Sequence, residues 1–231
     1  ISAGTMHACD IASGGIAWCW GLNGTQGRIG SDKLGSEEYS AVPVRVPGDH
    51  RFTQLETYGV TTCGVTVEGA VYCWGGNGWG ALGNGSNVSQ SHVPVAVSGG
   101  HNFKQIAAGG GHFCGLTTTG RVYCWGTNGS GELGDGQRTY RPTPVAAVPN
   151  LTFTSLTAGA EYTCGISTDG KTYCWGYDGM GNLGDGRPIS FGNTYSLTPV
   201  VVTGGHDFKQ ITAGHYHTCG VTTGGQGYCW G

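Results

Sequence analysis

Residues 112–126 read His-Phe-Cys-Gly-Leu-Thr-Thr-Thr-Gly-Arg-Val-Tyr-Cys-Trp-Gly. Two runs that suit β-strands flank residues 118–120, which predicts an antiparallel hairpin with a three-residue loop. The third position of such a loop takes a positive φ, and Gly120 adopts it without the penalty that a Cβ imposes. Counting outward from the loop places Cys114 opposite Cys124, as a non-hydrogen-bonded pair with Cα atoms about 4.5 Å apart. That distance allows a disulfide.

This hairpin occurs five times, and each copy has two cysteines ten positions apart and a glycine in the third loop position. The predicted disulfides join Cys9 with Cys19, Cys63 with Cys73, Cys114 with Cys124, Cys164 with Cys174, and Cys219 with Cys229. The loop glycines are Gly15, Gly69, Gly120, Gly170 and Gly225. A zinc knuckle is excluded because its cysteines are only about two to four residues apart. Disulfides persist in oxidising compartments, so the pattern predicts an extracellular, cell-surface or periplasmic protein.

A larger unit repeats every 50 to 55 residues around these hairpins. Each complete unit continues with a glycine-rich turn, which is closely alike in residues 74–85, 125–136 and 175–186. A Pro-Val segment and a segment that begins with phenylalanine follow, and no stretch has helical periodicity. Four short β segments in a unit of this length are typical of a propeller blade. Neighbouring blades must stack, because one blade cannot bury both of its faces.

The third unit carries motifs that identify a family. Ala-Gly-Gly-Gly-His-Phe-Cys-Gly-Leu at residues 108–116, Tyr-Cys-Trp-Gly at 123–126 and Asn-Gly-Ser-Gly-Glu-Leu-Gly at 128–134 resemble the repeats of the regulator of chromosome condensation family. The resemblance covers nearly the whole chain and implies an all-β propeller of four-stranded blades, usually seven in a ring. It also implies a blade-packing role for the histidine two residues before a cysteine. That position holds His7, His112 and His217, with Thr61 and Tyr162 in the other two units.

The repeat count predicts how this chain relates to such a ring. Five hairpins are present but only four complete connections between them, so we expect a single propeller domain over residues 1–231 with incomplete first and last blades. This arrangement favours a part of a seven-bladed ring, and the alternative is a five-bladed ring with a shared terminal blade. Open blade edges would favour self-association or capture of a protein partner. The cysteine pairs resemble those of secreted or surface bacterial members of the family rather than those of the nuclear exchange factor.

Composition and motifs exclude several classes of function. A net charge of -3 with only 11% charged residues argues against nucleic-acid binding, and no apolar run is long enough to span a membrane. Three Gly-x-Gly-x-x-Gly motifs lie in turns that no helix follows, so they are interpreted as structural. Asp135 and Asp185 suit turns better than a calcium site, which needs more carboxylates. No nucleophile or metal-ligand pattern appears, so we expect no enzyme activity, no cofactor and no metal.

Function is therefore sought in the connections that differ between repeats, residues 32–41, 86–92, 137–141 and 187–197. Loops on a rigid framework often carry recognition, and aromatic residues are favoured at interfaces. The candidate binding residues are Trp79, Tyr140, Tyr177, Met180, Phe191 and Tyr195. The leading hypothesis is a secreted or surface scaffold that binds protein partners. The alternatives are a lectin-like propeller that binds glycans, and large side chains that only fill gaps in the turns.

Overall fold

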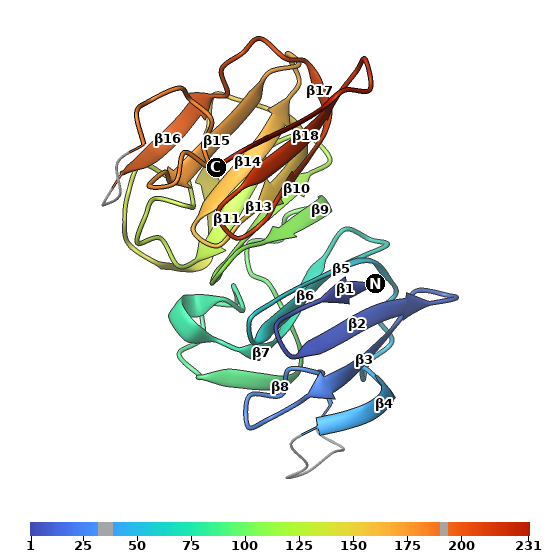
Figure 1. The fold of residues 1–231 in the computed structure, drawn as a ribbon. Coiled ribbons are helices and arrows are strands. Elements are labelled where there is room, and N and C mark those ends of the chain that lie inside the picture. The colour runs from blue at the N-terminus through green and yellow to red at the C-terminus, as the bar shows by residue number, and fades with distance from the viewer. Residues whose placement is uncertain (32–38, 190–193) are drawn as a thin grey trace.

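The computed structural model describes residues 1–31, 39–189 and 194–231, which form five antiparallel sheets in chain order. Each sheet is one blade, and the inner strands of successive blades lie side by side (Figure 1). The expected all-β architecture of four-stranded propeller blades is confirmed. Within the described residues, no helix is long and apolar enough to cross a membrane.

The strands follow the same order in every blade, from the inner strand outward. The first blade contains β1 (Ser2–Ala3), β2 (His7–Ala12), β3 (Ile16–Leu22) and β4 (Tyr39–Arg45). The second contains β5 (Phe52–Tyr58), β6 (Thr61–Thr66), β7 (Val71–Gly76) and β8 (Gln90–Ala96), with the short helix η2 (Gly78–Gly80) between the last two. The third contains β9 (Phe103–Ala108), β10 (His112–Thr117), β11 (Val122–Gly126) and β12 (Arg141–Ala147). The fourth contains β13 (Phe153–Ala158), β14 (Tyr162–Ser167), β15 (Thr172–Tyr177) and β16 (Tyr195–Val201). The fifth contains β17 (Phe208–Ala213), β18 (Thr218–Thr222) and β19 (Gly227–Trp230).

The hairpins have the register that their loops predict. Cys114 lies opposite Cys124, and the Thr117 N–H donates to the Arg121 carbonyl to close the three-residue loop. All five disulfides join cysteines ten positions apart, with Cα atoms 4.0 to 4.1 Å from each other. The five loop glycines have φ between 81° and 85°. Both the disulfide pairing and the need for glycine in the loop are therefore confirmed.

In the second to fifth blades, a tryptophan at the end of the hairpin joins its blade to the preceding blade. The indole of Trp125 is fully buried and donates from Nε1 to the Ala81 carbonyl at 2.9 Å. A Cβ on Gly83 would lie 2.8 Å from this ring, so glycine leaves the space that the indole fills. The same bond joins Trp74 to Arg28, Trp175 to Glu132 and Trp230 to Asn182. The conserved spacing of the repeat thus sets the stacking of one blade on the next.

Inner strands are joined by a glutamine that reaches the next blade. The Gln54 side chain accepts from the Ile106 N–H and donates to the Ile106 carbonyl, at 2.9 and 2.8 Å. Gln105 makes the same pair of bonds to Leu156. The two bonds satisfy both backbone groups of a residue whose side chain lies in the core between the blades.

The expected blade-packing histidines form a second connection between blades. His112 is fully buried, and its Nε2 lies 2.9 Å from the Thr163 hydroxyl of the next blade. That hydroxyl donates its only hydrogen to the Glu132 carbonyl, so the His112 Nε2–H must be the donor to Thr163. His7 makes the equivalent bond to Thr62 at 2.8 Å. In both histidines Nδ1 has no hydrogen-bond partner among the described residues, and burial lowers the pKa, to about 4 for His7 and about 3 for His112.

The packing of His112 requires a glycine three residues before it. A Cβ on Gly109 would meet the His112 ring and would lie 2.6 Å from the Gly159 carbonyl oxygen. We therefore expect Gly109→Ala to lower the free energy of unfolding by about 1–3 kcal/mol through overpacking. Gly129→Ala is the matched control, because nothing lies within 4 Å of a Cβ placed there. Urea denaturation of both variants measures the difference, and equal midpoints would contradict this account.

The two ends of the described blades differ from the middle. The inner strand β1 has two residues, and the fifth blade has three strands where the others have four. The disulfide of the fifth blade is partly exposed, whereas the other eight cysteines have no exposed surface. A single propeller domain over residues 1–231 with incomplete terminal blades stays a prediction, as does a ring of seven.

Candidate functional site

The variable connections lie on one face of the blades. Because each blade follows the same antiparallel course, the links between the third and fourth strands all leave from the same end. We call this end the loop face; it includes residues 77–89 and 127–140. The hairpin loops, such as residues 118–120, lie at the opposite end.

Trp79 is the most unusual residue of the loop face. Its backbone has φ 57° and ψ 23°, the left-handed conformation that non-glycine residues rarely adopt, and its side chain is 65% exposed. Asn77 fixes this turn, since its side-chain oxygen accepts from the Leu82 N–H at 3.0 Å. The Asn77 amide also donates to the carbonyls of Ser86 and Val88, which holds the following loop beside the turn. The fold thus holds a large apolar side chain in solvent at a cost in backbone strain.

Tyr140 from the third blade completes an aromatic pair with Trp79. The two ring centroids are 5.8 Å apart with an edge-to-face angle of 63°, and Tyr140 is 48% exposed. Beside them lies a groove of about 320 Å³, which Val88 and Pro142 also line. Tyr140 and Pro142 can lie here because Gly80 has no side chain. A Cβ on Gly80 would lie 2.4 Å from the Pro142 Cα, so glycine lets the third blade approach the turn. Two residues that are 61 positions apart in sequence therefore form one exposed surface.

The other candidate residues do not join this groove. The Tyr177 ring lies 5.7 Å from that of Tyr216, and Met180 lines a separate pocket at the fifth blade. Arg138 stacks on Tyr195, with its guanidinium carbon 4.4 Å from the ring centroid. Phe191 lies outside the described residues. Of the five candidates that lie within the described residues, the structure thus brings together two pairs: Trp79 with Tyr140 at the groove, and Tyr177 opposite Tyr195 on β15 and β16.

The inner strands line a polar pocket that the sequence did not reveal. Its volume is about 370 Å³, and two of its lining residues are joined by a hydrogen bond of 3.0 Å between the Tyr58 hydroxyl and His215 Nδ1. Tyr58 occupies the position where the other units have glycine, as in Gly109. A side chain fits there because the bulky packing residue three positions later is replaced by Thr61. This paired change within one repeat was a signal that could have identified Tyr58.

The titratable side chains that line this pocket are Glu56, Tyr58 and His215. Among the residues that line it, Glu56 is the one carboxylate, and burial raises its pKa. The described residues contain no group of three or more histidines, cysteines or carboxylates that could hold a metal ion.

The acidic residues of the glycine-rich turns serve those turns. Asp135 accepts from the Gln137 N–H at 3.0 Å and pairs with Arg141 at 2.7 Å. Asp185 accepts from the Arg187 N–H at 3.0 Å in the same way. These contacts confirm the interpretation of both residues as turn-stabilising.

Models of a known protein family match the same repeats. The model of the regulator of chromosome condensation (RCC1) repeat matches residues 68–116, 119–166 and 169–221, and a related model of that repeat matches residues 103–132. The chain belongs to the regulator of chromosome condensation repeat family.

Among curated relatives, the ultraviolet-B receptor UVR8 of Arabidopsis thaliana is 32% identical over 149 residues, which cover 62% of this chain and 33% of the receptor. The chain matches about a third of that relative's length. Among solved structures, Prp20p of Saccharomyces cerevisiae superposes with a TM-score of 0.83 at 20% identity, over 99% of this chain and 56% of Prp20p. Human WBSCR16 gives a TM-score of 0.81 at 22% identity, over 94% of this chain and 55% of that protein. Both superpositions support the propeller fold of this repeat family.

Proposed function

We propose that this chain is a non-catalytic propeller scaffold, secreted or displayed at a surface, that binds protein partners through its loop face. The observation that carries the proposal is the strained, exposed Trp79 with Tyr140 beside it. An indole that is 65% exposed gains little stability from burial, so the backbone strain at this position favours a role in recognition. Aromatic side chains with large accessible area are the usual anchors of protein interfaces.

Relatives of this fold give the proposal a precedent. Prp20p is described by its binding to Gsp1p and histones, and UVR8 is described as a receptor. The low net charge of this chain does not favour a histone-like basic partner, since attraction would require a strongly acidic surface. We therefore propose a partner that presents an apolar or aromatic anchor to the groove beside Trp79.

The five disulfides support the compartment of this proposal. All ten cysteines are paired in the structure, and eight are fully buried between blades. Such a set forms and persists where the surroundings are oxidising. A scaffold outside the cytoplasm, at a cell surface or in a periplasm, fits both the disulfides and the exposed recognition face.

Glycan binding is the second candidate, because an exposed indole could stack on a sugar ring. A lectin-like propeller would be expected to repeat its pocket in each blade. The positions equivalent to Trp79 are Thr25, Ser130 and Met180, so the pocket does not repeat.

The test compares two ligand libraries on the same protein. The chain is immobilised and screened against a phage-displayed random peptide library and against a glycan array. We expect enriched peptides with an aromatic or aliphatic anchor, and we expect Trp79→Ala to weaken their binding at least about tenfold, as for interface anchors. Val67→Ala is the control, since Val67 is 57% exposed and lies in a hairpin loop at the opposite end of the blades. Peptide binding that survives Trp79→Ala would contradict the proposal, and Trp79-dependent glycan binding alone would establish the alternative.

A further inference from the structure

The groove beside Trp79 and Tyr140 lies between the second and third blades. Its lining combines these two rings and Pro142 with the loop segment 86–89 and the turn that Asn77 fixes. We call it the Trp79 groove. Both blades pack against a further described blade on their other side, so the form of this groove does not depend on either end of the chain.

The corresponding places between the neighbouring blades are occupied by side chains of the protein itself. Between the first and second blades, His92 Nε2 lies 2.9 Å from the Thr25 carbonyl oxygen. Between the third and fourth blades, Arg138 donates from Nε to the Gly129 carbonyl at 2.6 Å. In both places a carbonyl of the glycine-rich turn is thus bound by a nitrogen-bearing side chain.

Carbonyls at the Trp79 groove already accept hydrogen bonds from the turn itself. That of Gly78, which corresponds to Gly129, accepts from the Ala81 N–H at 3.2 Å. Asn77 donates to the carbonyls of three residues of the loop segment, at 2.7 to 3.2 Å: Ser86, Val88 and Ser89. An occupant that brings N–H groups into the groove would therefore leave them without these acceptors, at a cost in free energy.

The groove instead offers donors that are not in use. The Trp79 indole N–H and the Tyr140 hydroxyl have no hydrogen-bond partner among the described residues, and the Ser86 hydroxyl is buried without one. An indole can only donate, and the two hydroxyls can donate as well. The occupant that matches this groove therefore presents carbonyl oxygens and few N–H groups.

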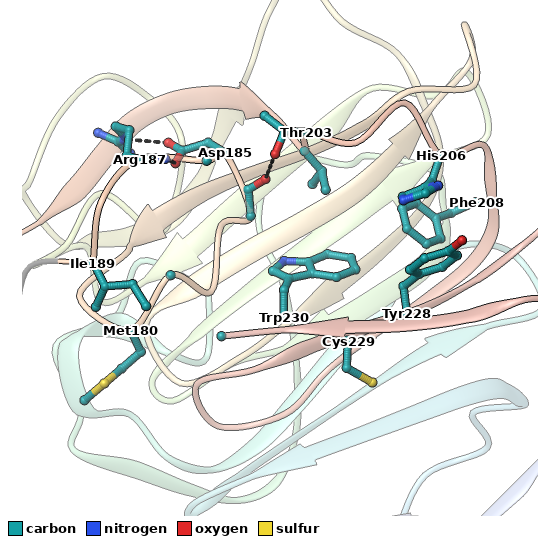
Figure 2. Close-up of a pocket in the computed structure, with 15 residues that line it drawn as sticks. Met180, Asp185, Arg187, Ile189, Thr203, His206, Phe208, Tyr228, Cys229 and Trp230 are labelled. Atoms are coloured by element: carbon teal, nitrogen blue, oxygen red, sulfur yellow. Dashed lines mark hydrogen bonds and ion pairs between the residues drawn. The ribbon is translucent and has the colours of Figure 1, made fainter.

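The lining also favours a neutral occupant. None of the described residues that line the groove is charged, so a charge brought into it would lose water without gaining a partner. The pocket at the fifth blade differs in this respect, since Asp185 and Arg187 form an ion pair on its rim (Figure 2). A carboxylate offers acceptors, but its charge makes it a poor match for the Trp79 groove.

A proline-rich segment combines these properties. Proline has no backbone N–H, and in the polyproline II conformation the carbonyls make no hydrogen bonds within the segment. Aromatic-lined grooves recognise such segments because the conformation is preformed and loses little entropy on binding. The chain itself shows that a proline fits beside these rings, because Pro142 packs so closely on the turn that a Cβ on Gly80 would lie 2.4 Å from its Cα.

We propose that the Trp79 groove binds a proline-rich segment of a partner protein in the polyproline II conformation, with carbonyl oxygens of the segment accepting from the Trp79 indole and from the Tyr140 and Ser86 hydroxyls. This assignment rests on the proposed function, because it names the partner chemistry of the same site.

The experiment titrates the 231-residue chain by calorimetry with two capped peptides, one of six prolines and one of six alanines. Both peptides are neutral and equally long, but each alanine adds an N–H that the groove does not pair. We expect saturable binding of the proline peptide and at least about tenfold weaker binding of the alanine peptide. In nuclear magnetic resonance spectra the Trp79 indole signal should shift on binding. The signal of Trp125, whose buried indole donates to the Ala81 carbonyl, should stay in place.

Protein variants separate the two donors from the apolar surface that carries them. The double variant Trp79→Phe with Tyr140→Phe keeps an aromatic ring at both positions but removes both donors, and it should weaken binding of the proline peptide at least about tenfold. Val67→Ala is the control, because Val67 is 57% exposed and lies outside the groove, and it should leave the affinity unchanged.

The outcomes distinguish this assignment from the proposed function. Lack of binding of the proline peptide, equal binding of the two peptides, full affinity of the double variant, or an unmoved Trp79 signal at saturation would overturn the proline-rich assignment. Proline-free library peptides that still bind in a Trp79-dependent way would then leave the proposed function standing. If neither kind of peptide binds, both the assignment and the proposed function are wrong.

Discussion

Reduction of the disulfides is expected to unfold most of the chain at room temperature. Each disulfide closes a loop of about ten residues, and loop-closure entropy alone would then stabilise the fold by about 2–3 kcal/mol. The actual stabilisation is smaller, because the hairpin already holds the two ends of the loop together. Even about 1 kcal/mol for each of five disulfides is comparable with the whole stability of a typical domain, about 5–15 kcal/mol. After reduction, the two thiols of a pair also occupy more volume than the disulfide did. Eight of the ten cysteines have no exposed surface, so this volume would have to fit into closed cores. Circular dichroism melts with and without reductant test this expectation.

The stabilisation that a single disulfide provides should depend on how deeply that disulfide is buried. The C114S/C124S variant places two hydroxyls in a closed core and should lower Tm by about 5–10 °C. The C219S/C229S variant is the control, because the same hairpin in the fifth blade is partly exposed, and its Tm should fall less. A fully reduced protein that melts within about 2 °C of the oxidised one would contradict the role given to the disulfides.

The repeat made the fold accessible from sequence, because local rules act the same way in each unit. The loop glycine determines which residues face each other, so the pairing of Cys114 with Cys124 follows from counting alone. The contact between Trp79 and Tyr140 could not be predicted by counting residues in this way. It depends on how closely the third blade approaches the second, and that distance is set by Gly80 against Pro142 in three dimensions. Contacts within a blade were therefore predictable, and contacts between blades required the structure.

The pocket that the inner strands line shows the same limit. The Tyr58–His215 bond joins the second blade to the fifth, and no pattern within one repeat places those residues together. The aromatic candidates were selected because they vary between repeats, and this variation does not show which of them lie in contact.

Acid is expected to destabilise the fold through its two buried histidines. Burial lowers the pKa of His112 to about 3 and that of His7 to about 4, with Arg28 also lowering the latter. The unfolded chain takes up these protons near pH 6.5, while the folded chain stays neutral. The free energy of unfolding therefore falls as pH drops from about 6.5 toward 4, by roughly 3 kcal/mol for each histidine. Glu56 and Glu132 act in the opposite direction, because burial raises their pKa values and their protonation in acid relieves a cost.

A substitution at His112 separates the histidine effect from that of the carboxyls. His112→Gln keeps an N–H that can donate to Thr163 but removes the titrating ring. The stability of this variant between pH 6 and 4.5, from urea denaturation, should depend on pH less steeply than that of the parent by about 1.4 kcal/mol per pH unit, one proton's worth. His7→Gln is the companion variant, because His7 makes the equivalent bond to Thr62 and its pKa is also lowered by burial, so it should flatten the slope in the same way. Equal slopes for the parent and His112→Gln would mean that His112 is protonated in the folded chain, and its buried Nδ1 would then have to find a partner that the structure lacks among its described residues.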